Sequence, residues 1–311
     1  MSDCVVILLI TGYLKSNTES KLKEVFKMTT YAVTGITGKF GSEALKTLTQ
    51  FVSANDVIGI ARNVKKAQAM VPAGVTVRQG DYSDKASMVS ALAGVDKLLF
   101  VSSQPGAEVP RQQQHQNVID AAKSAGVSYV AYTSYAHIET AKSPLADDHR
   151  YTEKAIMDAG LAHSFLRNNW YLENDLAPIQ SALKGQPFVY AGTGRVGWAA
   201  EKDYAQAAAK VMTLTQPKDI YEFAGAPRYY SDLAEVVKTV SDRSFEVQAI
   251  SEDDYQKSLE DSGMDAGTSA VVTSLQSLIS SGDLDEDNQD LPDVLGRPLT
   301  DLAEVIKANQ E

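Results

Sequence analysis

The chain has 311 residues, of which 44% are hydrophobic and 22% charged, so it has room for one large or two modest globular domains. Its net charge of −11 disfavours a nucleic-acid or anionic-membrane surface, because phosphate binding needs clustered lysine and arginine. The single cysteine, Cys4, excludes an intrachain disulfide framework, and with four histidines at no metal-ligand spacing we predict no metal site.

The first 27 residues do not fit the pattern that follows them. The apolar run 5–10 is far too short to span a bilayer, and the preceding Asp3 is not the positive region of a signal peptide. Residues 15–27 are polar and charged, and an ordinary first strand begins a few residues after Met28. We therefore expect residues 1–27 to be a poorly ordered upstream extension, a start-site artefact being one explanation.

A turn with regularly spaced glycines follows the short β-type run 31–34 and opens an amphipathic stretch. The first glycine, Gly35, permits a tight turn, Gly38 lets the backbone approach a pyrophosphate, and Gly41 allows close packing of helix on sheet. The N-terminus of the following helix presents free N–H groups to the anion. The pattern predicts a strand, a phosphate-binding turn and a helix.

The choice of cofactor depends on the end of the second predicted strand, residues 56–61. Arg62 follows it, close to the ~20-residue spacing at which a dinucleotide fold selects its cofactor. An acidic residue there would bind a ribose 2′-hydroxyl, whereas Arg62, with Lys65 and Lys66 behind it, offers cations to a 2′-phosphate. We predict NADPH rather than NADH; the alternative is that the glycines serve packing and Arg62 is a solvated loop charge.

Alternating strands and helices continue beyond Arg62. Strands are predicted at 75–78, 97–101, 129–132 and 163–166, and helices at 64–70, after Asp84, at 111–125 and at 151–159. The most hydrophobic strand, 97–101, is typical of a parallel sheet covered on both faces. It is followed by Ser102, Ser103 and Gln104, which we expect to line the cofactor cleft because ligands bind at the carboxyl ends of such strands.

The second half of the chain is more mixed. A strand near 187–190, a helix from 203 to 214 and a strand at 221–224 precede a helical, acidic remainder, whose run 283–287 lacks the ligand alternation of a calcium loop. We predict an α/β fold, a Rossmann-type doubly wound parallel sheet with a smaller α/β C-terminal substrate domain. The NADP-binding domain would cover 28–167, completed by segments near 195–224, and the substrate domain mainly 168–311.

Eight separated segments share one family's pattern in the right order: AVTGITG at 32–38, IARN at 60–63, GDY at 80–82, LLFVSS at 98–103, AYTS at 131–134, TEK at 152–154, LRNNWY at 166–171 and LGRPLT at 295–300. From about Met28 onward the chain resembles the NmrA-like branch of the atypical short-chain dehydrogenases, most closely the bacterial NAD(P)H:quinone oxidoreductases. The resemblance implies that nicotinamide and quinone meet in a cleft between the two domains.

The resemblance also implies roles for individual residues. The pyrophosphate would be held by Gly35, Ile36, Thr37, Gly38, Lys39 and Phe40, the 2′-phosphate by Arg62, and the middle of the cofactor by Ser102, Ser103 and Gln104. Near the nicotinamide and substrate would lie Asn168, Asn169, Trp170 and Tyr171. Asn169 stands where the closest relatives usually have glycine, which affects the detail of the substrate pocket.

A catalytic pair is less clearly marked. Ordinary short-chain dehydrogenases use Tyr-x-x-x-Lys, whereas here Tyr151 and Lys154 are one residue closer. Since partners at i,i+3 and i,i+4 both share a helix face, cooperation between them stays open. The other interpretation makes Tyr151 a surface residue and leaves Lys154 to contact the cofactor ribose or the substrate.

A quinone needs no strong general acid, because hydride transfer to its ring leaves a delocalised, weakly basic anion that water can protonate. Stacking and one or two hydrogen-bond donors suffice, and Tyr135, His137, Trp170 and Tyr171 follow or end strands at suitable places. His137 is equally explained as a loop histidine with a structural hydrogen bond.

The leading hypothesis is a cytoplasmic NADPH-dependent reductase of quinones or similar electron-poor carbonyl compounds. The alternative is an NADP-binding sensor without turnover; reduction of phenolic ethers and nucleotide-sugar chemistry share the fold but lack a clear acid here. We expect a small-molecule quinone as partner, no nucleic acid and no membrane insertion, and leave a homodimer open.

Overall fold

The computed structural model describes residues 28–310, so the expectations for residues 1–27 lie outside the described part. A sheet of seven strands, all parallel, runs in the order β3-β2-β1-β4-β5-β6-β8. Its strands are β1 Tyr31–Thr34, β2 Val57–Ala61, β3 Thr76–Gln79, β4 Lys97–Phe100, β5 Tyr129–Tyr135, β6 Ala162–Asn168 and β8 Ile220–Phe223. The predicted doubly wound α/β sheet is confirmed.

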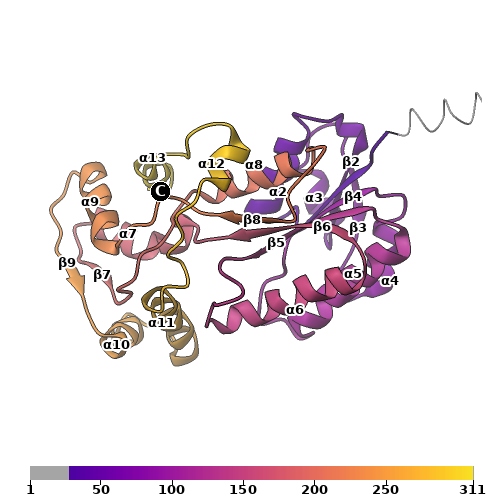
Figure 1. The fold of residues 1–311 in the computed structure, drawn as a ribbon. Helices are drawn as coiled ribbons and strands as arrows, with labels where there is room; N and C mark the ends of the chain where they lie inside the picture. Colours follow the sequence, from indigo (N-terminus) through magenta and orange to yellow (C-terminus); the bar gives the residue numbers. More distant parts are fainter. Residues whose placement is uncertain (1–27, 311) are drawn as a thin grey trace, which may run out of the picture.

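Helices cover both faces of this sheet (Figure 1). On one face pack α2 Lys39–Leu48, α3 Val64–Gln68, α8 Glu201–Val211 and α12 Asp290–Leu295. On the other pack α4 Lys85–Ala91, α5 Arg111–Ala125 and α6 Pro144–Asp158. Burial on both sides explains why strands such as β4 and β2 read as apolar runs rather than as alternating patterns.

The remaining elements build a smaller lobe beside the carboxyl ends of the strands (Figure 1). Its elements are α7 Leu176–Leu183, β7 Phe188–Tyr190, α9 Tyr230–Val240, β9 Val247–Ala249, α10 Glu252–Asp261, α11 Ala266–Ser280 and α13 Leu302–Ala308. Strands β7 and β9 form a separate parallel pair. The short 3₁₀ turns η1 Ala54–Asp56 and η2 Leu172–Asp175 complete the described elements. The strand β9 was not predicted, because its three residues lie inside a stretch dominated by helical patterns.

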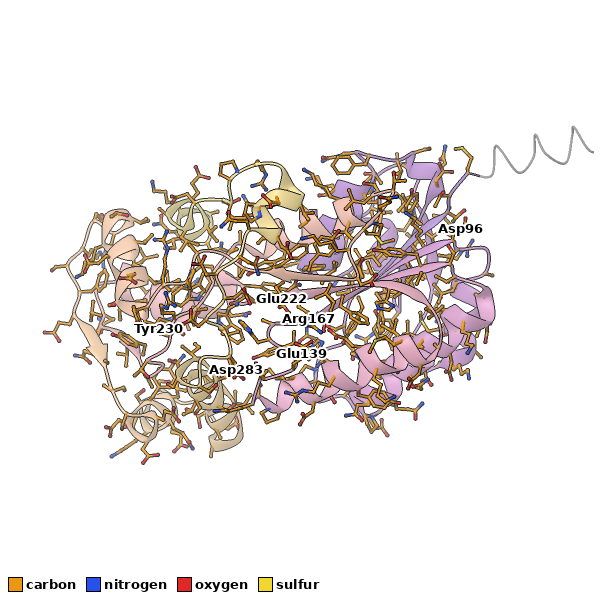
Figure 2. The ribbon with its side chains drawn as sticks, viewed as in Figure 1. Asp96, Glu139, Arg167, Glu222, Tyr230 and Asp283 are labelled. Atoms are coloured by element: carbon orange, nitrogen blue, oxygen red, sulfur yellow. The ribbon has the colours of Figure 1, made fainter. Side chains whose placement is uncertain are left out.

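Strands β5 and β6 extend farther than predicted, since their register continues to Tyr135 opposite Asn168. The polar side chains at the carboxyl ends of these two strands form hydrogen bonds with a buried carboxylate: Ser134 donates to Glu153 at 2.6 Å, and Arg167 donates to the same carboxylate at 2.8 Å. Figure 2 shows Arg167 lying with Glu139 and Glu222 where the sheet meets the lobe. A hydrophobic run therefore marks the core of these strands and misses their ends.

Helix α6 begins at Pro144, well before the predicted start at Tyr151. The Ser143 side chain accepts a hydrogen bond from the Leu145 amide, and a proline in the first turn needs no donor there. Farther on, β8 comes from the second half of the chain and pairs with β6, so the sheet includes a segment near 195–224.

The order of the strands reverses between β1 and β4, because the chain moves outward through β2 and β3 and then returns to the other side of β1. At such a switch point, the loops beyond the carboxyl ends of adjacent strands diverge and leave a crevice for a ligand. The loops after β1 and β4 are thereby the places where this fold is expected to bind.

Candidate functional site

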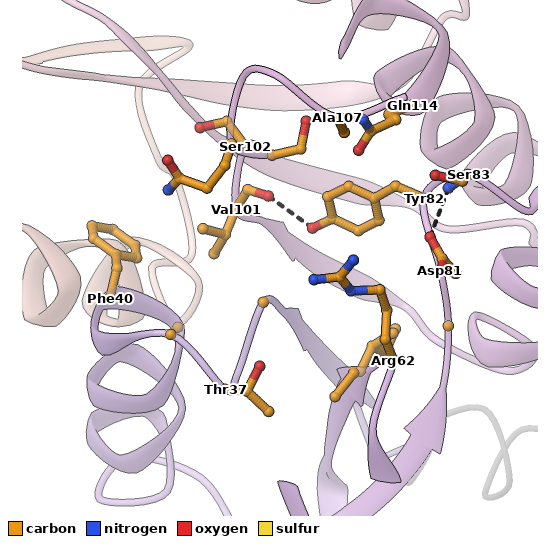
Figure 3. Close-up of a pocket in the computed structure, with 18 of the residues that line it drawn as sticks. Thr37, Phe40, Arg62, Asp81, Tyr82, Ser83, Val101, Ser102, Ala107 and Gln114 are labelled. Carbon is orange, nitrogen blue, oxygen red and sulfur yellow. Dashed lines mark hydrogen bonds between the residues drawn. The ribbon is translucent and has the colours of Figure 1, made fainter. Parts of the chain in front are cut away.

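A cavity of about 610 Å³ lies at this switch point (Figure 3). It is walled by the loops that follow β1, β2, β3 and β4. Among its lining residues are the predicted Gly35, Thr37, Gly38, Lys39, Phe40, Arg62, Ser102, Ser103 and Gln104. Segments that are far apart in sequence are thus brought to one concave surface.

The glycine turn after β1 has the geometry that an anion requires. Gly35 has φ of +66° and its carbonyl accepts from the Gly38 amide at 3.0 Å. A Cβ on Gly41 would lie 2.4 Å from the Gly35 carbonyl oxygen, so helix α2 can pack this close only with glycine there. A Cβ on Gly38 would meet only that oxygen, at 3.4 Å, and Gly38 caps the helix without a side chain. The turn forms a cradle that a pyrophosphate fits.

The charges around the cavity are of both signs. Arg62 is exposed and points toward the cavity in Figure 3, and within residues 28–310 its guanidinium has neither an ion pair nor a hydrogen bond. Glu201, the first residue of α8, also lines the cavity. Burial and then the neighbouring Glu173 raise the pKa of Glu201, while Lys39 and the Phe40 amide act against that rise. An unpaired arginine beside a glycine turn is the arrangement that a 2′-phosphate needs.

The wall after β3 carries residues to which no role was assigned from the sequence. Asp81, Tyr82 and Ser83 all line the cavity (Figure 3). The Tyr82 hydroxyl contacts Thr34 Oγ1 and Val101 O, the latter at 2.7 Å, and burial raises the pKa of this phenol. Tyr82 therefore keeps its proton and joins the ends of β1 and β4. Asp81, Tyr82 and Ser83 follow the predicted strand at 75–78. The rule that ligands bind at the carboxyl ends of parallel strands, which selected Ser102, could therefore have selected them as well.

Ile36 and Tyr171 lie next to the cavity without lining it. The Ile36 side chain is 1% exposed and fills the space above Gly59, so it supports the turn from below. The Tyr171 ring stacks on Phe40 with 6.2 Å between ring centroids and accepts a hydrogen bond from Asn168 Nδ2 at 2.8 Å. The Oδ1 atom of Asn168 is buried and has no hydrogen-bond partner in the described structure. Asn168 thus has a free acceptor, Oδ1, and contacts Tyr171, which in turn stacks on the cavity residue Phe40.

Asn169 and Trp170 face the smaller lobe. Asn169 Nδ2 donates to the Leu284 carbonyl at 3.1 Å, and its Oδ1 accepts from the Trp170 amide at 2.8 Å. The Trp170 indole donates to Asp175 at 3.1 Å and packs in the core of the lobe. Both residues join the lobe to the end of β6, and neither is among the residues that line the cavity.

Tyr151 and Lys154 both lie on the exposed side of α6, as in the interpretation that makes Tyr151 a surface residue. The Tyr151 hydroxyl donates to Gln116 at 2.8 Å, and the Lys154 ammonium forms an ion pair with Asp158 at 2.6 Å with 71% of its side chain exposed. Neither side chain lines the cavity. Helix α6 turns His149, Thr152 and Glu153 toward the core instead, because each of these has a buried polar partner.

His137 is held in the loop after β5 with a positive φ of +48°. Its Nε2 lies 2.9 Å from Glu286 Oε2, outside hydrogen-bond geometry, and its amide donates to Glu222 at 3.4 Å. His137 does not line the cavity, so its contacts agree with the structural interpretation that the sequence left open.

The described residues contain no group of three or more histidine, cysteine, aspartate or glutamate side chains able to hold a metal ion. In the same part of the chain, no helix combines the length and the apolar character needed to cross a membrane.

Comparison with known proteins adds to this geometry. The family described as NAD(P)H-binding matches residues 35–213. Quinone oxidoreductase 2 of Escherichia coli is 40% identical over 88% of this chain and 96% of its own length. The crystal structure of that organism's NADPH-dependent quinone oxidoreductase complexed with NADPH superposes with a TM-score of 0.84 at 39% identity, covering 89% of this chain and 99% of the other. Triphenylmethane reductase of Citrobacter, complexed with NADP(H), has a TM-score of 0.84 at 33% identity and covers 90% and 99%.

Proposed function

Because the chain belongs to the NmrA-like family of NAD(P)H-binding proteins, we propose that it catalyses the NADPH-dependent reduction of quinones. Similarity to a quinone oxidoreductase over nearly the whole length of both chains is the observation that carries this function. The cavity at the switch point supplies the site that the reaction requires.

NADPH is the cofactor, and the residues of the cavity fit it. The turn from Gly35 to Gly41 leaves room for a pyrophosphate against the N-terminus of α2, where backbone N–H groups favour an anion. Arg62, unpaired within the described residues, would hold the 2′-phosphate, and Ser102 and Gln104 would flank the middle of the cofactor.

Bound NADPH supplies a hydride, and the protein's own residues position the reacting rings. We place the nicotinamide end near Phe40 and Tyr171, whose stacked rings offer an apolar surface. The unpaired Oδ1 of Asn168 fits a carboxamide N–H donor, because a buried acceptor without a partner is costly. Water supplies the proton, since the reduced quinone is a weak base and Tyr82 retains its own proton.

The smaller lobe would bind the quinone. It meets the sheet at Asn169 and Trp170, next to the end of β6 where the nicotinamide is placed. We propose a cytoplasmic location, where NADPH is available to a reductase, and a small-molecule quinone as the hydride acceptor, with no part for nucleic acid.

The test is oxidation of NADPH by the purified protein with and without a benzoquinone. We expect oxidation only when quinone is present, formation of one hydroquinone per NADPH, and weaker activity with NADH. NADPH binding without turnover on any quinone would contradict the function and favour the NADP sensor.

Gly38→Val is the matched control for the site. A Cβ at this position would meet only the Gly35 carbonyl oxygen, at 3.4 Å, so we expect the fold to persist while the valine side chain fills the pyrophosphate space and NADPH binding is lost. Titration of NADPH by fluorescence measures this, and wild-type affinity in the folded variant would contradict the phosphate turn.

A further inference from the structure

The segment that follows β4 is held from behind by side chains of α5. Ser103, which lines the cavity, donates its amide N–H to His115 Nε2 at 3.0 Å, and the same nitrogen lies 3.1 Å from Ser103 Oγ. The Ser103 carbonyl accepts from Arg111 Nε at 2.8 Å. Both backbone polar groups of one cavity residue are therefore bound by two side chains one helical turn apart.

The direction of these hydrogen bonds determines the protonation of His115. The Thr152 hydroxyl donates to the Asp148 carbonyl at 2.6 Å, so its oxygen accepts from the His115 Nδ1–H at 2.8 Å. With the proton on Nδ1, Nε2 is free to accept from Ser103. Burial, and next the charge of Arg111, lower the pKa of His115 to about 3, so the ring stays a neutral acceptor at ordinary pH.

Arg111 is oriented in the same way. An arginine can only donate, so its Nη2 donates to His149 Nε2 at 3.1 Å, and His149 donates from Nδ1 to the Tyr132 hydroxyl at 2.8 Å. The Nη1 atom of Arg111 lies 3.7 Å from Asp148 Oδ2. Both α5 side chains are thus held by residues of α6: the buried His149 and Thr152, and the partly exposed Asp148, which lie within about one turn.

We propose that His115 and Arg111 are positioning residues for NADPH: they hold the backbone of Ser103, and with it the cavity wall at 102–104, through a hydrogen-bonded chain that begins at Thr152 on α6. The proposal rests on the proposed NADPH site. Neither side chain contacts the cofactor space directly, so both act through Ser103. A backbone amide that loses a buried acceptor reorients, and the loop then pays ordering entropy when NADPH binds.

Two variants of His115 separate positioning from general stability. His115→Leu removes the acceptor at similar size, whereas His115→Gln can supply an acceptor near the position of Nε2. We expect the leucine variant to raise the Kd for NADPH about fivefold or more, with kcat at saturating NADPH changed less than about twofold, and the glutamine variant to stay within about twofold of wild type.

Thr152 provides a second pair that is one step farther from the cavity. Thr152→Val removes the oxygen that receives the Nδ1–H, and Thr152→Ser keeps it. We expect a severalfold weaker Kd for the valine variant, recovery in the serine variant, and ¹⁵N imidazole shifts that report Nδ1–H for His115 in wild type. If His115→Leu does not fold, this pair of variants tests whether the hydrogen-bonded chain positions Ser103 for NADPH.

Fluorescence titration of NADPH to the complete chain is the deciding measurement. Wild-type affinity in folded His115→Leu or Thr152→Val, or a proton on Nε2 of His115, would overturn the proposal. Because the readout is binding, a wild-type protein that binds NADPH and reduces no quinone would contradict the proposed function and leave this test unaffected.

Discussion

Two arginines at the carboxyl edge of the same sheet have opposite surroundings. Arg62 follows β2, is exposed, and has neither an ion pair nor a hydrogen bond in the part of the chain that the structure describes. Arg167, near the end of β6, is 5% exposed and forms ion pairs with Glu139 and Glu222 (Figure 2) and with the buried Glu153. The first is left available for a ligand anion, while the second is consumed by the protein's own carboxylates.

The difference shows how the two ends of the edge serve different purposes. Around β1 and β2, helix N–H groups and Arg62 stay open, at little cost because water reaches them. Around β5 and β6, the sheet meets the lobe, and charges excluded from water must be paired there. Substitutions at the two ends should therefore separate binding from stability.

Arg167→Leu should have the largest effect. Removing the guanidinium leaves buried Glu153 without its cation, which we expect to lower the free energy of unfolding by about 3–5 kcal/mol. Urea unfolding measures it, with Arg62→Leu as the control that should change stability by less than about 0.5 kcal/mol. Equal losses of stability in the two variants would show that Arg167 is no more important to the fold than the exposed Arg62.

The lobe side also buries Asp175, whose carboxylate accepts, among residues 28–310, only from the neutral donors Trp170, Trp198 and Tyr230. Burial raises its pKa to about 6. Since this is above the unfolded value, the contribution of Asp175 to stability is complete at low pH and is lost as the pH rises through 6.

Asp175→Asn removes this titration. We expect the wild-type stability relative to the variant to fall by about 2 kcal/mol between roughly pH 4 and pH 7. A shift of about two pKa units corresponds to about 3 kcal/mol in all, and part of that is already lost at pH 4, close to the unfolded pKa. Unfolding of both proteins at the two pH values tests it. A difference that does not change with pH would show that Asp175 ionises as in water.

Arg62→Glu should change cofactor choice and leave stability intact. A carboxylate repels the 2′-phosphate and can accept from the ribose of NADH, and loss of one charge-assisted contact costs ~1.5–3 kcal/mol, or roughly ten- to a hundredfold in affinity for NADPH. Lys154→Glu makes the same charge reversal at an exposed residue that does not line the cavity and serves as control. An unchanged ratio of kcat/KM for NADPH and NADH would show that Arg62 does not bind the 2′-phosphate.

Lys154→Ala and Tyr151→Phe should have the smallest effects. Both side chains lie on the outer face of α6, so we expect kcat/KM to change less than about twofold, whereas loss of a general acid typically costs ~10²–10⁴. Steady-state kinetics with one quinone at constant pH checks this. A collapse of kcat in Tyr151→Phe with unchanged NADPH affinity would restore the tyrosine–lysine pair.

Local patterns in the amino-acid sequence are enough to identify the phosphate turn, Arg62 and the loop at 102–104 as one candidate site. These features follow from local rules: a glycine at Gly35 permits a positive φ, and parallel strands end on one edge wherever they lie in the sheet. The rule about strand ends also applies to Asp81 and Tyr82, which follow a predicted strand and line the cavity.

Which polar residues of α6 face inward, and where residues 168–171 point, depends instead on how the chain packs. Spacing places Tyr151 and Lys154 on one face of a helix but does not say which face is buried. His149, Thr152 and Glu153 are buried because Arg111, His115 and Arg167, distant in sequence, satisfy their hydrogen bonds. A polar side chain loses little by burial once such partners exist, and their presence is a property of the packed chain alone.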